Sequence, residues 1–139
     1  VFRGTEVAIK KIFDPVITDK LREEIDNEVY MLNRIRHPHI VIMMGYSTKP
    51  PNLFIIFELL KKGSLFDLLH KQKEKLPEPV KLKIARQVAS ALNFIHQSKV
   101  VHRDVKSLNV LLDEQYNTRL CDFGIARKFV SIGSDTVKS

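Results

Sequence analysis

One polar string in the second half of the chain restricts the fold more than any other feature of the sequence. The string HRDVKSLN, from His102 to Asn109, lies between the β-favouring pieces KVVH and NVLLD, and the string DFG closes a third such piece, TRLCDF. Short apolar pieces separated by polar turns predict small hairpins. DFG alone would be a common chance match, but its position after HRDVKSLN and NVLLD is not.

The first polar string has the residue types that phosphoryl transfer needs. That reaction depends on positioning and charge stabilisation: a carboxylate accepts the hydroxyl proton, a cation lies near the moving phosphoryl group, and an oxygen ligand holds a metal. Asp104, Lys106 and Asn109 offer these three functions within one short loop. A polar turn with no catalytic function is the alternative, and the order and spacing of these residues argue against it.

The second polar string offers a metal ligand. Mg²⁺ prefers carboxylate oxygens and bridges phosphates. Asp122 follows an apolar strand-like run, so it can present such an oxygen at the end of a strand, and Gly124 gives the backbone freedom to reverse.

The first half of the chain predicts a strand followed by an amphipathic helix. The string VAIK ends at Lys10, and apolar residues then recur at helical spacing at Leu21, Ile25, Val29, Leu32 and Ile35. Glu28 falls on or beside this apolar face, where a carboxylate is costly to bury unless it is paired. Lys10 is the natural partner, and a solvated glutamate at the helix edge is the alternative.

The remaining elements follow from similar patterns. Strand-like runs cover 40–46 and 53–59, with the turn-rich STKPPN between them and a connector at 61–64. A second helix is expected from Pro77 onward, with one face made by Leu82, Ala85, Ala89, Leu92 and Ile95. The first half is therefore strands with one helix, and the second is helical with small hairpins.

Composition excludes several classes of protein. The 139 residues are 44% hydrophobic, which is typical of a globular chain. The formal charge of +7 could indicate an anionic partner, but the basic residues are scattered among 16 acids and aromatic residues are few, so we expect no nucleic-acid partner. No apolar run is long enough to span a membrane. The single cysteine, Cys121, is compatible with a reducing compartment, and we expect a cytoplasmic protein.

Taken together, these strings resemble the eukaryotic protein kinase catalytic domain over essentially the whole chain. The chain is most similar to the tyrosine-kinase-like branch, with its Raf-like and mixed-lineage-type serine/threonine kinases. RHPHIVIMMGYSTKPPNLFIIFELLKKGSLFDLLH, HRDVKSLNVLLD and LCDFGIAR carry this likeness. The resemblance implies an α+β, two-lobed fold: residues 1–59 would be a small β-rich lobe with one key helix, and 60–139 the first part of a mainly helical large lobe.

The resemblance also implies ATP and Mg²⁺ as cofactors and a function for each matching position. Asp104 would be the catalytic base, Lys106 the γ-phosphate contact, and Asn109 and Asp122 the Mg²⁺ ligands. Lys10 would bind the α- and β-phosphates and pair with Glu28. The adenine site would comprise Phe57 at its back, the backbone of Glu58 and Leu60, and the side chains of Ala8 and Leu111. His102, Leu32, Met43 and Phe123 would stack into an apolar column between the lobes.

Substrate and regulation are indicated by three features. Lys106, two residues after Asp104, resembles the serine/threonine pattern, so a protein serine or threonine would be the substrate. Arg103 resembles kinases that phosphorylation of the activation segment switches on, by an upstream kinase or by autophosphorylation. Candidate acceptors are Ser131, Ser134, Thr136 and Ser139.

The sequence also departs from the family pattern. The Gly-rich loop is missing, with Val1 at most its last trace, and no APE follows DFG. We therefore expect a partial domain that is inactive alone and belongs to a longer kinase. A pseudokinase scaffold and a dual-specificity kinase are the alternatives.

Overall fold

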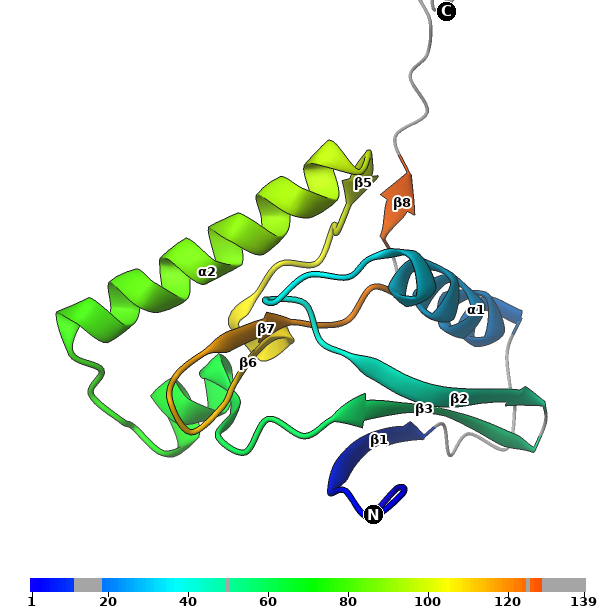
Figure 1. Ribbon diagram of the computed structural model, residues 1–139, viewed down its shortest axis with the longest axis horizontal. Coiled ribbons are helices and arrows are strands. Elements are labelled where there is room, and N and C mark those ends of the chain that lie inside the picture. Colours follow the sequence, from blue (N-terminus) through cyan, green and yellow to red (C-terminus); the bar gives the residue numbers. More distant parts are fainter. Residues whose placement is uncertain (12–18, 50, 125, 129–139) are drawn as a thin grey trace, which may run out of the picture.

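The computed structural model describes residues 1–11, 19–49, 51–124 and 126–128. In the first half, strand β1 (Val7–Lys11) precedes helix α1 (Asp19–Arg34), strand β2 (Met43–Lys49) and strand β3 (Asn52–Glu58). The three strands form an antiparallel sheet in the order β1-β3-β2, with Lys10 opposite Ile55. Helix α1 packs beside this sheet at one end of the molecule (Figure 1).

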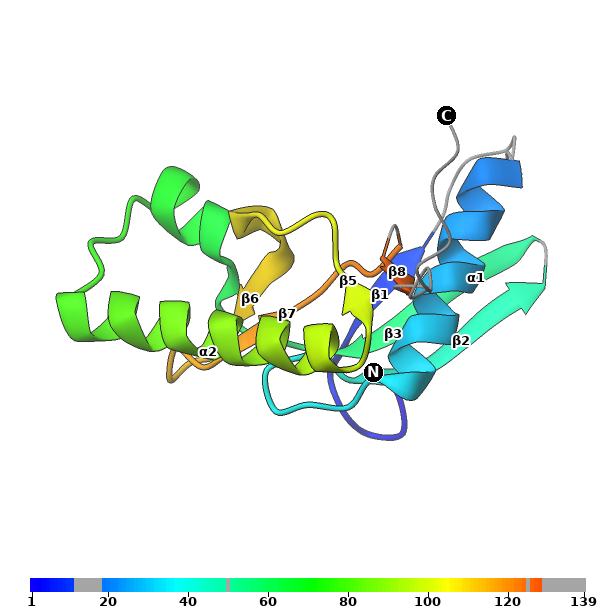
Figure 2. The ribbon, with the colours of Figure 1, turned by 90° about the horizontal axis from the view of Figure 1, so that it is seen from above.

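The second half is built around one long helix. Strand β4 (Gly63–Ser64) leads into a π-helical turn η1 (Asp67–Lys71) and helix α2 (Glu78–Gln97). Then come β5 (Val100–Val101), the 3₁₀ turn η2 (Ser107–Asn109), β6 (Val110–Leu112), β7 (Thr118–Leu120) and β8 (Arg127–Lys128). Strands pair in the order β4-β6-β7, and β5 pairs with β8. Helices α1 and α2 lie at opposite ends of the molecule (Figure 2), which confirms the α+β prediction.

Helix α1 has the face that the sequence predicts. Its buried residues are Ile25, Glu28, Val29, Met31 and Leu32. Asp19 in the first turn and Arg34 in the last complement the helix dipole. Among the described residues, no helix is both long and apolar enough to cross a membrane.

The strand predicted at 40–46 begins later, at Met43, and runs to Lys49. The apolar residues before it are used differently: Ile40 forms an isolated parallel bridge to Leu120 of β7. The Leu120 N–H donates to the His39 carbonyl at 2.8 Å, and the Val41 N–H donates to the Leu120 carbonyl at 3.0 Å. This apolar run therefore joins the sheet region to β7 before it enters the sheet.

The buried face of α2 differs from the predicted one. Leu82 is 62% exposed, whereas Ile84, Ala91 and Ile95 are buried. Of the predicted face, Ala85 and Ala89 are also exposed, and only Ile95 is fully buried. Apolar residues at helical spacing occur on two adjacent sides of this helix, so periodicity alone could not select the side that packs.

Two apolar cores support these elements. The larger contains α1, β3 and residues of the second half such as Ala91, Ile95 and Phe123, so it includes residues from both sides of the division expected at residue 59. The smaller lies around Leu68, Ile84 and Leu112. The division at residue 59 stays a prediction.

Ile95 tests the larger core because its side chain is fully buried. We expect Ile95→Ala to lower the free energy of unfolding by about 2–5 kcal/mol and Ile95→Val by about 0.5–1.5 kcal/mol, since each deletes buried methyl groups. Urea denaturation of the protein that contains this chain measures both changes. Equal effects of the two substitutions would contradict a close-packed site.

Candidate active site

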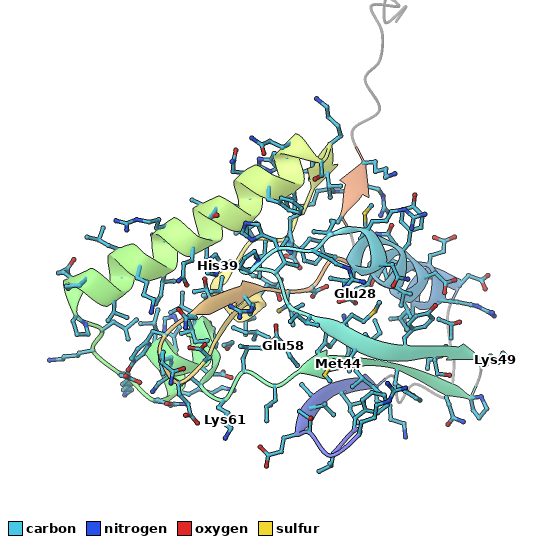
Figure 3. The ribbon with its side chains drawn as sticks, viewed as in Figure 1. Glu28, His39, Met44, Lys49, Glu58 and Lys61 are labelled. Atoms are coloured by element: carbon cyan, nitrogen blue, oxygen red, sulfur yellow. The ribbon has the colours of Figure 1, made fainter. Side chains whose placement is uncertain are left out.

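An ion pair between a partly exposed lysine and a buried glutamate joins β1 to α1. The Lys10 Nζ lies 2.7 Å from the Glu28 Oε2, and the Glu28 side chain is 2% exposed. Glu28 lies between α1 and the sheet (Figure 3), so a solvated glutamate at the helix edge is excluded. Burial alone would lower the pKa of Lys10, but the charge and hydrogen bond of Glu28 raise it above its usual value. Burial raises the pKa of Glu28, and Lys10 opposes this shift.

Asp122 lies beside this pair. Its Oδ1 is 3.8 Å from the Lys10 Nζ and accepts a hydrogen bond from the Gly124 N–H at 3.4 Å. The φ angle of Asp122 is 64°, a left-handed conformation that costs about 1–3 kcal/mol for a residue other than glycine. Such conformations persist where the surrounding structure enforces them, and they are concentrated at functional sites.

The loop from His102 to Asn109 brings its own polar groups together. The Lys106 Nζ lies 3.4 Å from the Asp104 Oδ1. The Asn109 Nδ2 donates to the Asp104 carbonyl at 2.9 Å and to the Asp104 Oδ2 at 3.3 Å. Both hydrogen bonds use the amide nitrogen of Asn109, so its amide oxygen is the atom available to a cation. Arg103 has a φ of 73°, so this loop is also strained just before Asp104.

His102 holds the two polar strings together. The Asp104 N–H donates to the His102 Nδ1 at 3.1 Å, and the His102 Nε2 lies 2.8 Å from the Cys121 carbonyl oxygen. With Nδ1 as the acceptor, Nε2 is the ring nitrogen that donates to the Cys121 carbonyl. The ring packs edge-on against Phe123 at 4.8 Å. His102 is therefore a structural residue, as its place in the apolar column implied.

A cavity of about 200 Å³ collects most of the predicted site residues. Its lining contains the following residues that the sequence indicated: Ala8, Lys10, Glu28, Phe57, Asn109, Leu111 and Asp122. An adjoining cavity of about 150 Å³ shares Lys10, Glu28 and Asp122 and adds Asp104. The structure therefore brings several chain segments, distant in the sequence, around one space.

Glu58 and Leu60 are not among the residues that line this cavity. The Glu58 N–H donates to the Ile42 carbonyl at 3.0 Å, and the Leu60 carbonyl accepts from the Gly63 N–H at 3.0 Å. The Glu58 side chain forms an ion pair with Arg119 at 3.2 Å and accepts from the Ile42 N–H at 3.0 Å. Their proposed contact with adenine stays a prediction.

Two further residues, Val41 and Cys121, line the cavity, and the sequence analysis did not assign them to it. Cys121 directly precedes Asp122, so its position beside DFG was the available signal. No sequence signal indicated Val41, because it lies in an apolar run that is typical of an ordinary strand.

Comparison with known proteins identifies the chain. Residues 2–138 match the family described as the protein kinase domain. The chain belongs to this family. This kinase domain sequence is 44% identical, over its whole length, to a probable serine/threonine-protein kinase of Dictyostelium discoideum, of which it covers 15%.

Two plant relatives are similar to this kinase sequence as well. Serine/threonine-protein kinase CTR1 of Arabidopsis thaliana is 42% identical over 91% of the chain, which covers 16% of that protein. Serine/threonine-protein kinase STY17 of the same organism is 36% identical over the whole chain, which covers 25% of it. These relatives agree with the resemblance to the tyrosine-kinase-like branch. The fold is accordingly part of the two-lobed kinase fold.

Protein kinases in general use ATP and Mg²⁺, and the donor set of this kinase site suits that pair. Among the described residues, no group of three or more His, Cys, Asp or Glu side chains could enclose a metal ion. Mg²⁺ rarely needs such a group, because it is commonly held by one or two carboxylates together with substrate phosphates. Asp122 and the amide oxygen of Asn109, in one cavity with Lys10, fit this arrangement.

The ion pair between Glu58 and Arg119 gives a test of how this kinase site is held between β3 and β7. Both side chains are about one-fifth exposed, at 23% and 21%. We expect a double-mutant cycle with Glu58→Gln and Arg119→Gln to give a coupling energy of about 0.5–1 kcal/mol that decreases in high salt. Urea denaturation of the variants measures this coupling energy. The control is the ion pair between Lys61 and Glu114, whose side chains are both 60% exposed. We expect its coupling energy to be near zero.

Cys121 gives a pH-dependent test. Burial, together with the charges of Asp122 and Glu28, raises the pKa of its thiol to about 12. Only the thiolate reacts with alkylating reagents, so the labelling rate should still be rising above pH 10 in the native protein. The labelling rate of the unfolded protein should be half-maximal at about pH 8.5 and should level off by about pH 10. Mass spectrometry of the Cys121 peptide measures both, and a native plateau near pH 9 would contradict the burial.

Proposed function

We propose that the protein that contains this chain transfers the γ-phosphoryl group of ATP to a serine or threonine hydroxyl of a protein, with Mg²⁺. The observation that supports this most is the grouping of Lys10, its buried partner Glu28, Asp122 and Asn109 around one cavity. A fold without chemistry has no need for a lysine held at 2.7 Å from a buried carboxylate and 3.8 Å from a second one.

Lys10 would bind the α- and β-phosphates as a fixed cation. Glu28 keeps the ammonium in place, because an unpaired carboxylate at this depth would be unstable. Asp122 and Asn109 would hold Mg²⁺, which would offset the negative charge of the phosphates. The adenine would lie between Ala8 and Leu111, in front of Phe57, against the backbone of Glu58 and Leu60.

Asp104 would act as the base. It accepts the proton of the attacking hydroxyl while the new oxygen–phosphorus bond forms and the bond to the β-phosphate oxygen breaks, so that ADP leaves. Lys106, at 3.4 Å from the Asp104 carboxylate, would offset charge on the transferring group. Asn109 orients Asp104 through its two hydrogen bonds.

A cavity with three cations in its lining supports a proposal about regulation. Lys20, Arg103 and Arg127 line this cavity of about 510 Å³ beside α1, together with Glu23 and Glu24. A phosphate on the activation segment, added by an upstream kinase or by autophosphorylation, would pair with these cations. Its candidate acceptors, Ser131, Ser134, Thr136 and Ser139, lie outside the described residues. We propose a cytoplasmic location, with residues 1–59 in the small lobe and 60–139 in the large one.

Asp104→Asn tests the function in the full-length protein. Loss of the base should lower transfer from radiolabelled ATP to a generic protein substrate by at least about 100-fold. Asp26→Asn, at an exposed carboxylate of α1, is the matched control and should retain activity. Phosphoserine or phosphothreonine in the product would identify the class, whereas phosphotyrosine in addition would indicate dual specificity. No transfer by the wild-type protein, phosphorylated on its activation segment, would favour a scaffold.

A further inference from the structure

The side chain of Asn27 makes three hydrogen bonds that the kinase site described above does not use. Its Nδ2 donates to the backbone carbonyl oxygens of Ala126 at 2.9 Å, Gly124 at 3.0 Å and Phe123 at 3.3 Å. These carbonyls belong to the segment that directly follows Asp122. Two amide hydrogens are shared among three acceptors, so the segment is folded around this one nitrogen.

Asn27 and its neighbour Glu28 make α1 a link between two parts of the site. Successive helical residues point about 100° apart, so Glu28 reaches Lys10 on β1 while Asn27 reaches the backbone after Asp122. The Lys10 Nζ also lies 3.8 Å from the Asp122 Oδ1. These contacts close a ring that runs from Lys10 through α1 to the segment of Asp122 and back.

This segment lies between β7, which ends at Leu120, and β8, which begins at Arg127. At its start, the Cys121 N–H donates to the Asn109 carbonyl at 2.9 Å. Further on, the Gly124 N–H donates to the Asp122 Oδ1 at 3.4 Å and the Ala126 N–H to the Phe123 carbonyl at 3.1 Å, so these two bonds stay within the segment and Asn27 supplies a contact from another element. Asp122 also holds a φ of 64°, which a surrounding contact must maintain. An asparagine suits this task because its amide is a neutral donor, whereas an aspartate carboxylate would repel the carbonyl oxygens.

We infer that Asn27 is a positioning residue for the Mg²⁺-binding step: it holds the backbone of Phe123, Gly124 and Ala126 so that Asp122 faces the cation. The inference rests on the proposed function, because it assigns Mg²⁺ to Asp122. It differs from a purely structural role, in which Asn27 would only attach α1 to the core and the Mg²⁺ requirement would not depend on it.

Three variants of the full-length protein test it. Asn27→Ala removes the donor, and Asn27→Gln keeps the amide on a longer side chain. Asn33→Ala changes a second asparagine of α1, which is exposed, and is the matched control. For each we would measure the Mg²⁺ dependence of ADP binding by calorimetry, the hydrogen exchange of the peptide containing Asp122 without metal, and kcat and KM at several Mg²⁺ concentrations.

We expect Asn27→Ala to raise the Mg²⁺ concentration for half-maximal ADP binding by about 5–10-fold, as loss of one or two hydrogen bonds predicts. Exchange in the Asp122 peptide should increase, and saturating Mg²⁺ should restore most of kcat. Asn27→Gln should fall between Asn27→Ala and the wild type, and Asn33→Ala should match the wild type. If Asn27→Ala does not fold, the Mg²⁺ requirement of Asn27→Gln decides.

The outcomes separate this inference from the proposed function. Suppose that the wild type is active and that both Asn27 variants need the same Mg²⁺ concentration as the wild type. This result would overturn the inference alone, even if the thermal stability of the variants fell. A wild type that binds ADP with Mg²⁺ but transfers no phosphoryl group would overturn the proposed function, and the binding and exchange data would still decide on Asn27. A wild type that binds no ADP with Mg²⁺ would overturn both.

Discussion

The carboxylate of Glu28 is the group around which the site is organised. It is almost fully buried, and a charge at that depth is stable only with a partner in contact. Lys10 is that partner, at 2.7 Å. This contact fixes the distance between β1 and α1 and the side of α1 that faces β1. The same ammonium lies beside Asp122, which brings a third segment of the chain into the same electrostatic unit.

Contacts between the two halves of the chain hold this unit against the loop from His102 to Asn109. The bridge from Ile40 to Leu120 and the ion pair from Glu58 to Arg119 both tie the sheet region to β7. From the end of β7, the Cys121 N–H donates to the Asn109 carbonyl and the Cys121 carbonyl accepts from His102. The loop that contains Asp104 and the segment that contains Asp122 are thus fixed to each other through hydrogen bonds of Cys121.

The residue types of the candidate site and the approximate elements were predictable from the sequence, because both depend on local order. HRDVKSLN and DFG carry their residue types in fixed spacing, and the apolar periodicity of α1 placed Glu28 beside its buried face. The family and the fold class follow from the same strings. The elements that the patterns misplaced were those whose partner is distant in the chain: the run from His39 to Val41 bonds β7 before β2 begins, and α2 packs through Ile84 instead of Leu82.

What the sequence determined by itself is therefore the set of reactive groups and the helical phase that pairs Glu28 with a lysine. Only the tertiary structure decided which segments meet: that Asn27 donates to three carbonyls nearly a hundred residues away, and that Val41 and Cys121 line the cavity. An asparagine on a helix has no sequence signature for such a contact, since its amide can bond to any carbonyl that packing brings near. The position of Asn27 in the sequence does not tell which carbonyl groups pack against it. Only the tertiary structure brings those groups together.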